Sequence, residues 1–215
     1  NPYETQIVLM KIDTEGELLW FKTYENSGWN SWGSILTLPI NSYLLISVSQ
    51  PVYGGSEPAH IHLIEIDSVG QPIWEQYIAN NAVPIHAEQT LDGGFLISGY
   101  QYNDATGYDM YVVKTDATGE VEWEKTYGEP TNDGGCYVSQ RADGNLVLLG
   151  LRDNGSNTGN YLYYAVLEPN AGIVLTDAIH SKNITFGPMG TNYIKNNFDV
   201  ACVTVSYGAP PIWEV

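Results

Sequence analysis

The clearest copy of a repeated phrase in this chain reads Tyr111-Val-Val-Lys-Thr-Asp116-Ala-Thr-Gly119-Glu-Val-Glu-Trp123-Glu-Lys-Thr-Tyr127. Related stretches occupy residues 8–24 and 63–77, and a weaker copy begins at residue 165. Each of the three clear copies has an Asp, a turn Gly three residues later and a Trp four residues after that Gly. The turn positions are separated by 54, 49 and 53 residues, at Gly16, Gly70, Gly119 and Gly172. A period of this length in strand-forming sequence is typical of propellers and related arrays.

Each repeat contains four short runs of alternating, β-branched or aromatic residues, which predict four strands. The expected first strands are 32–38, 85–90, 136–141 and 189–194, and the second are 43–49, 95–101, 146–152 and 198–207. The expected third strands are 6–12, 60–66, 110–115 and 161–167, and the fourth are 17–24, 72–77, 120–127 and 173–178. No segment shows a helical period with caps. The sequence therefore predicts an all-β fold, a β-propeller of four-stranded antiparallel blades in a single domain over residues 1–215.

The repeat starts and stops in the middle of a blade. The chain opens on a third strand and ends after a second strand, so the N-terminal pair 6–12 and 17–24 would complete the blade begun by 189–194 and 198–207. This arrangement predicts four blades, with the ring closed by the N-terminal strands. The alternative is a fragment of a larger ring, because the tail around Trp213 echoes the phrase around Trp74.

Composition narrows the class of partner. The chain has 25 acidic and 8 basic side chains, and its net charge of −17 disfavours nucleic acid and anionic membranes as partners. No apolar run approaches the length of about 18 residues that a membrane helix needs. The two cysteines, Cys136 and Cys202, are either free thiols or a disulfide, and free thiols are favoured because facing sheets stand about 10 Å apart.

The connections between the expected strands alternate in length. Tight Asp-Gly turns join first to second and third to fourth strands, whereas the other connections are longer, dissimilar and on the opposite end. Variable loops on a rigid frame usually carry binding residues. Aromatic residues in or beside the long connections are therefore the candidate binding residues: Trp29, Trp32, Tyr53, Tyr102 and Tyr108. The recurring Trp20, Trp74 and Trp123 are interpreted instead as packing between blades.

Two connections are rich in oxygen ligands, at residues 103–109 and 153–160. They are weak calcium candidates, through Asp104, Asp109, Asp153 and Asn157, or else ordinary solvated turns, because neither has the distal Glu of a calcium loop. No other cofactor is expected. Glu88, on an expected innermost strand, is the carboxylate best placed for catalysis, but no spacing selects a partner for it and no nucleophile motif is present. We therefore expect no enzymatic activity.

The segments 113–128 and 89–100 resemble a propeller-type repeat family of secreted and surface-anchored proteins of bacteria, notably those using type IX secretion, and of archaea. The similarity covers most of residues 6–152 and implies export and a surface role. That family has no shared catalytic residues to carry over. The sequence is thus interpreted as an extracellular or cell-surface, non-catalytic binding or structural module that contacts a protein or glycan with its long-loop face, within a larger surface assembly or alone. The alternative function is a carbohydrate-active enzyme with channel carboxylates such as Glu88.

Overall fold

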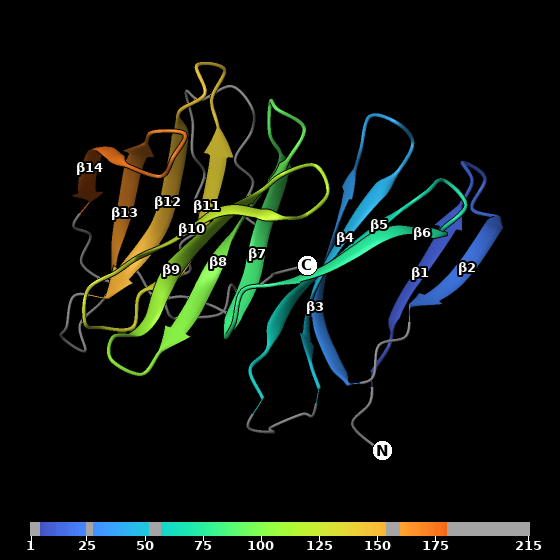
Figure 1. Cartoon of the computed structure of the whole chain (residues 1–215), viewed down its shortest axis with the longest axis horizontal. Helices are drawn as coiled ribbons and strands as arrows, with labels where there is room; N and C mark the ends of the chain where they lie inside the picture. Colours follow the sequence, from blue (N-terminus) through green and yellow to red (C-terminus); the bar gives the residue numbers. More distant parts are fainter. Residues whose placement is uncertain (1–4, 25–27, 52–56, 154–159, 180–215) are drawn as a thin grey trace, which may run out of the picture.

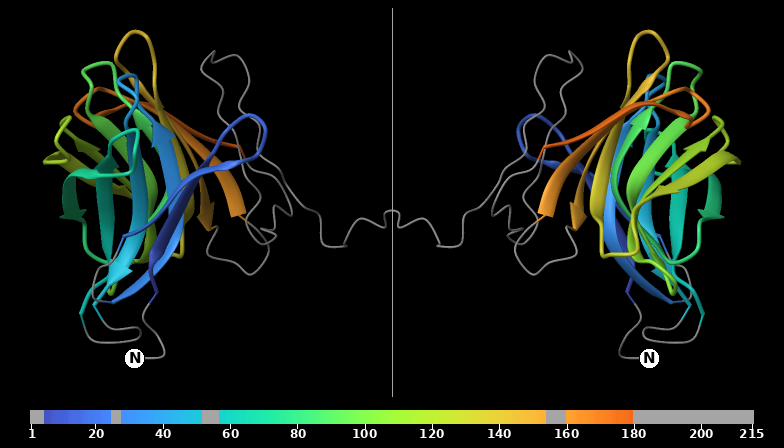
Figure 2. Two further views of the ribbon diagram at one scale, coloured as in Figure 1. Left: turned by 90° about the vertical axis from the view of Figure 1, so that its right-hand side faces the viewer. Right: turned by 90° about the vertical axis from the view of Figure 1, so that its left-hand side faces the viewer.

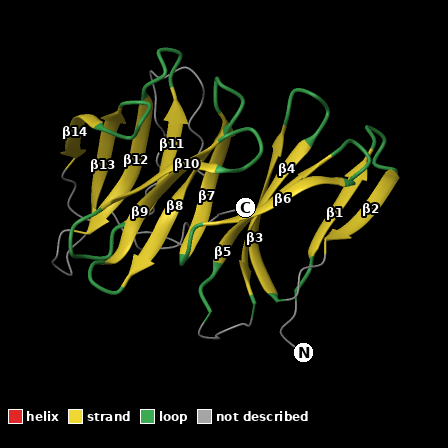
Figure 3. Ribbon diagram, in the orientation of Figure 1, coloured by secondary structure: helices red, strands yellow, loops and turns green. Residues whose placement is uncertain are grey.

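The structure is a computed structural model that describes residues 5–24, 28–51, 57–153 and 160–179. These residues form fourteen strands in antiparallel sheets and contain no helix (Figure 1, Figure 3). The prediction of an all-β fold with four-stranded antiparallel sheets is therefore confirmed. In the parts of the chain that the structure describes, no helix has the length and apolar character needed to span a bilayer.

One hairpin and three four-stranded sheets follow one another along the chain, in an open array (Figure 1). The hairpin pairs β1 (Ile7–Ile12) with β2 (Leu18–Tyr24). The next sheet contains β3 (Trp29–Thr37), β4 (Tyr43–Gln50), β5 (His60–Ile66) and β6 (Pro72–Ile78). It is followed by β7 (Ala82–Gln89), β8 (Phe95–Asn103), β9 (Gly107–Thr115) and β10 (Val121–Tyr127). The last sheet contains β11 (Gly134–Gln140), β12 (Leu146–Asp153), β13 (Asn160–Leu167) and β14 (Ile173–Ile179).

Within each sheet the spatial order follows the chain order, as the repeat predicts. The expected strands at 189–194 and 198–207 lie outside the described residues, and so does the pairing predicted to close a ring.

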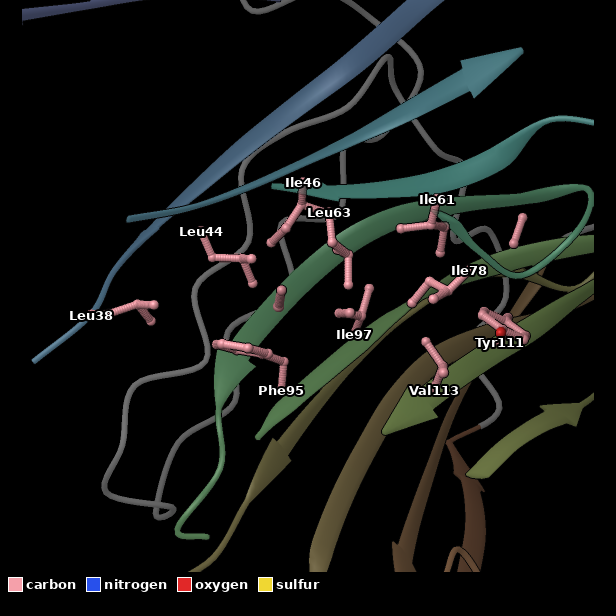
Figure 4. Close-up of a cluster of buried hydrophobic side chains, with 12 residues drawn as sticks. Leu38, Leu44, Ile46, Ile61, Leu63, Ile78, Phe95, Ile97, Tyr111 and Val113 are labelled. Atoms are coloured by element: carbon pink, nitrogen blue, oxygen red, sulfur yellow. The ribbon is translucent and has the colours of Figure 1, made fainter. Parts of the chain in front are cut away.

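Consecutive sheets pack face to face, and their apolar side chains form the core. Between sheets β3–β6 and β7–β10, Leu44 and Leu63 meet Phe95, Ile97 and neighbouring side chains (Figure 4). An equivalent cluster joins β7–β10 to β11–β14, and a smaller one joins the hairpin to β3–β6. Period-two alternation places one set of side chains on each face of a strand, and β4, β5, β8 and β9 are buried on both faces over most of their length.

Seven short turns share one geometry, and they join β1–β2, β3–β4, β5–β6, β7–β8, β9–β10, β11–β12 and β13–β14. Each is a five-residue segment closed by a backbone N–H donating to the carbonyl four residues later, at 2.6–2.9 Å. The fourth residue of every segment has a positive φ: Gly16, Asn41, Gly70, Gly93, Gly119, Gly144 and Ala171. The turn position of the weakest repeat is thus Ala171, with φ 67°, rather than Gly172 as the sequence suggested. The register then puts Leu175, not Thr176, at the missing Trp position, opposite Val166.

Trp20 and Trp74 pack on the turns of the next sheet, in line with the prediction that the recurring tryptophans pack between repeats. A Cβ on Gly70 would lie 3.2 Å from the Trp20 ring, and a Cβ on Gly119 would lie 2.7 Å from the Trp74 ring. Two tyrosines make a matching hydrogen bond, because Tyr24 Oη donates to Gly70 O at 3.1 Å and Tyr127 Oη donates to Ala171 O at 2.9 Å. The repeated phrase therefore fixes how each sheet docks on the next.

Candidate functional site at the long-connection end

The two ends of the sheets differ. The shared turns gather at the upper end in Figure 1, and in both side views of Figure 2 they again lie together at the upper end. The other connections lie at the opposite end, here called the long-connection end. Two of them are shorter than predicted, because β6–β7 and β8–β9 are joined by residues 79–81 and 104–106 alone. The strands extend where loops were expected, since pairing of β8 with β9 continues to Asn103 opposite Gly107.

This extension gathers three tyrosines at the long-connection end. Tyr102 pairs directly with Tyr108 across β8 and β9, with ring centroids 5.2 Å apart, and Tyr100 meets Tyr108 edge-on at 5.5 Å. Tyr102 and Tyr108 remain 45% and 44% exposed. Burial raises the pKa of Tyr100, so its hydroxyl stays protonated. Edge-to-face pairs of this kind stabilise each other, which holds the exposed rings in place. We call these three residues the tyrosine cluster.

The connection between β10 and β11, at residues 128–133, packs against the tyrosine cluster. Asp133 N donates to Tyr108 O, and Tyr108 N donates to Asn132 Oδ1 at 3.2 Å, so residues 132–133 lie beside β9 where its pairing with β10 has ended. A Cβ on Gly135 would lie 3.3 Å from the Tyr100 ring, so the start of β11 supports the cluster from the side. Tyr102 and Tyr108 were predicted, although as loop residues. Tyr100 was not, because its role depends on a partner across the strand pair.

Two buried carboxylates lie next to the tyrosine cluster. A Cβ built on Gly128 would touch both Asp109 Oδ1 and Asp133 Oδ2, so the two groups approach each other beside this glycine. Asp133 accepts N–H bonds from Glu129 and Asp153, at 2.8 and 2.9 Å. Burial raises the pKa of Asp133 despite these bonds. Asp109 Oδ2 accepts a hydrogen bond from Thr106 Oγ1 at 2.6 Å, whereas its Oδ1 is buried without a hydrogen bond.

The calcium candidates are only partly brought together. Asp109 faces Asp133, which the sequence did not single out, while Asp104 is exposed in the turn between β8 and β9. Asp153 approaches Asp133 through its backbone N–H. Asn157 lies outside the described residues. Among the residues that the structure describes, no three His, Cys, Asp or Glu side chains surround a common point as metal ligands.

Trp29 and Trp32 both belong to β3, as expected for Trp32, whereas Trp29 was expected in a connection. Their side chains are outside the described part of the structure. Tyr53 lies wholly outside the described residues.

Glu88 cross-links β7 and β11, the first strands of two neighbouring sheets. Its carboxylate accepts hydrogen bonds from Ser139 Oγ, at 2.7 Å, and from Gln140 N, and His86 Nε2 lies 3.9 Å away. Among the described residues, no acidic side chain bonds with it. These contacts tie β7 to β11, which is a structural task for the carboxylate that the sequence put forward for catalysis.

Cys136 is a free, fully buried thiol between the last two sheets. Its Sγ lies 3.4 Å from the carbonyls of Gly99 and Tyr111, on the side of β11 that faces sheet β7–β10. Cys202 lies outside the described residues.

Grooves also run between the outer strands of neighbouring sheets. One of about 230 Å³ lies between β2 and sheet β3–β6 and is lined by Lys22, Tyr24, His62 and Glu75 among others. A second, of about 390 Å³, occupies the equivalent place one repeat later, where Gln76 and Glu124 stand at the positions of Lys22 and Glu75. In the first, His62 stacks on Tyr77 at 4.2 Å, and burial lowers the pKa of His62. Because the grooves repeat with the sheets, we interpret them as a consequence of sheet packing.

Comparisons with known proteins do not assign a function to this chain. No family model matches the chain, and no curated protein matches it. The structure is similar to the crystal structure of a protein of unknown function from Bacteroides caccae, with 12% sequence identity and a TM-score of 0.43. The match covers 82% of this chain and spans 59% of the length of that protein.

Proposed function

We propose that the chain is a β-propeller module of a secreted or surface-exposed protein, and that it binds a glycan or protein partner without catalysis at its long-connection end. The observation that carries the proposal is the tyrosine cluster, because two of its rings are nearly half exposed yet held by strand pairing and ring contacts. Rigid, amphipathic tyrosines give contact area at a low entropic cost.

The propeller architecture is supported by the way the sheets repeat. Each sheet docks on the next through the same Trp-on-turn contact, and the four strands of each sheet lie in sequence order. A four-bladed ring closed by the N-terminal hairpin continues this packing rule by one further step.

The surroundings of the tyrosine cluster favour a glycan as the partner. Exposed oxygen-bearing side chains lie beside it, namely Asn103, Asp104 and Asn132, with Tyr108 N held by Asn132. Aromatic faces combined with hydrogen-bonding side chains suit sugar rings, which are apolar on their faces and polar at their edges. The structural role of Glu88 supports a binding module over a hydrolase that uses this carboxylate.

The proposal is tested by probing a glycan array with the labelled chain and its variants. We expect Tyr102→Ala and Tyr108→Ala each to weaken binding by about 1–3 kcal/mol, roughly 5- to 150-fold. Tyr77→Ala is the matched control, because Tyr77 is 46% exposed but lies on β6, in another sheet. Equal losses in all three variants, or none in the two cluster variants, would contradict the proposed site.

A further inference from the structure

The hairpin β1–β2 has an apolar face that the described residues leave open. Val8, Met10 and Ile12 on β1 are 52%, 59% and 55% exposed, and Phe21 on β2, opposite Met10, is 54% exposed. In the repeat register, the same three positions on β5 are His62, Ile64 and Ile66, and all three are buried. The equivalent residues of β9, namely Tyr111, Val113 and Thr115, are buried as well. On β5 and β9 this face is covered by the preceding unit of the array, and among the described residues the hairpin has no such cover.

The free edge of β1 needs a neighbour too. Among the described residues β1 pairs with β2 alone, whereas its equivalents β5, β9 and β13 also pair with a second strand. That pairing follows one rule, in which the residue directly after a shared turn faces the residue directly before the next one. The pairs are Tyr43 with Ile66, Phe95 with Thr115, and Leu146 with Leu167.

We propose that residues 198–204 of this same chain form the missing strand beside β1, with Phe198 opposite Ile12, Asp199 opposite Lys11 and Cys202 opposite Val8. The inference rests on the propeller part of the proposed function and not on the tyrosine cluster. The register is set by Asn196, which precedes Phe198 as Asn41 precedes Tyr43, and Asn41 adopts the positive φ of the shared turn. Residues 180–215 directly follow β14, so the segment belongs to the next step of the repeat.

In this register, the side chains of residues 198–202 match the chemistry of β1 on both faces of the sheet. Phe198, Val200 and Cys202 fall on the face of Val8 and Met10, so the apolar face would continue from β1 onto the new strand. Asp199 falls on the opposite face beside Lys11, whose Nζ lies 5.4 Å from the centre of the Tyr43 ring and 3.3 Å from Ser68 O. A slip by one residue would move the apolar set to the wrong face and Asp199 away from Lys11.

A cysteine placed opposite Cys202 tests the register. In Val8→Cys, mild oxidation with oxidised glutathione is expected to join residues 8 and 202 within one chain, as residues paired across strands lie close enough to bridge. The product is a monomer that migrates faster on a non-reducing gel, and peptide mapping identifies the bond. Leu9→Cys is the matched control, because the neighbouring residue points to the other face and is not expected to link. Cys136 does not interfere, since burial raises the pKa of its thiol to about 12.

A disulfide between two copies would overturn the proposal, as it would assign the edge of β1 to a second molecule. Equal linkage of Val8→Cys and Leu9→Cys, or none, would also overturn it. If the cysteine variant folds poorly, the melting temperatures of charge variants test the same register. Lys11→Glu and Asp199→Lys are each expected to lower the melting temperature, and the double variant to recover part of the loss; additive losses contradict the register. Neither experiment involves Tyr102 or Tyr108, so failure of the register is distinguishable from failure of the binding site.

Discussion

The two ends of the sheets use the same strands for different purposes. At the turn end, seven five-residue turns share one hydrogen bond and one positive-φ position, and tryptophans of one sheet pack on the turns of the next. At the long-connection end the described connections, at residues 79–81, 104–106 and 128–133, lack this turn, and tyrosines stay exposed on strands that continue to the edge. Geometry that recurs in every sheet serves packing, while features that occur once are free to serve recognition. Variants at the two ends should therefore separate stability from binding.

The largest expected effect is at the turn end, in Gly119→Ala. A Cβ there would lie 2.7 Å from the Trp74 ring, at a φ of +83°. Left-handed strain and overpacking together should cost about 3 kcal/mol of unfolding free energy, measured by urea denaturation. Gly16→Ala is the matched control, because its φ is +89° but a Cβ meets nothing within 4 Å. It should lose about 1 kcal/mol, from strain alone. Equal losses would mean that Trp74 does not lock the two sheets together.

A smaller effect is expected from the side chain that caps a turn. Asp67 Oδ1 accepts the N–H groups of Val69 and Gln71, at 2.9 and 2.8 Å. Asp67→Ala should therefore cost about 1.5 kcal/mol of unfolding free energy. Asp104→Ala, in the turn at the other end, should change it by less than about 0.5 kcal/mol. If thermal unfolding shows a larger loss for Asp104→Ala than for Asp67→Ala, the turn end is not the end that stabilises the fold.

The buried acid pair predicts a pH-dependent effect at the long-connection end. The raised pKa of Asp133 means that the folded state holds its proton more tightly than the unfolded chain does. Its contribution is thus fully favourable below the ordinary pKa of 3.8 and is lost as pH rises through the raised value. Asp109→Asn removes the facing charge and should stabilise the fold by about 1 kcal/mol at pH 7, with no gain near pH 3.

Asp133→Asn provides the contrast for that experiment. Asp133 accepts backbone N–H groups from Glu129 and Asp153 on its two oxygens, so an amide there would turn a donor toward one of them. This variant should be less stable than the original chain at both pH values. Stabilisation by Asp133→Asn, or a gain from Asp109→Asn that persists at pH 3, would show that the stability gain of Asp109→Asn does not come from removing charge repulsion between Asp109 and Asp133.

The recurring parts of the molecule could be predicted from the sequence. The bounds of β5, at 60–66, match because an Ile- and Leu-rich run ends at an Asp-x-x-Gly turn, and the packing of Trp20 and Trp74 followed from their period. The turn of the weakest repeat was misplaced by one residue, since Gly172 stands beside the true position Ala171 and glycine is the expected occupant.

The parts that occur once could not be predicted in the same way. Tyr102 and Tyr108 were found by residue type, but their pairing depends on how far β8 and β9 extend. The contact of Asp109 with Asp133 depends on Gly128 letting two connections approach, and no spacing in the sequence encodes it.

The most direct test compares exposed side chains at the two ends in one binding experiment. One double variant is Tyr102→Ala with Tyr108→Ala, and the other is Ile40→Ala with Leu91→Ala, whose side chains are 80% and 72% exposed on the shared turns. On a glycan that the unmodified chain binds, the first should lose binding by at least about tenfold while both variants remain folded, and the second should bind normally. Loss in the turn-end variant with normal binding in the tyrosine variant would place recognition at the opposite end and contradict the account.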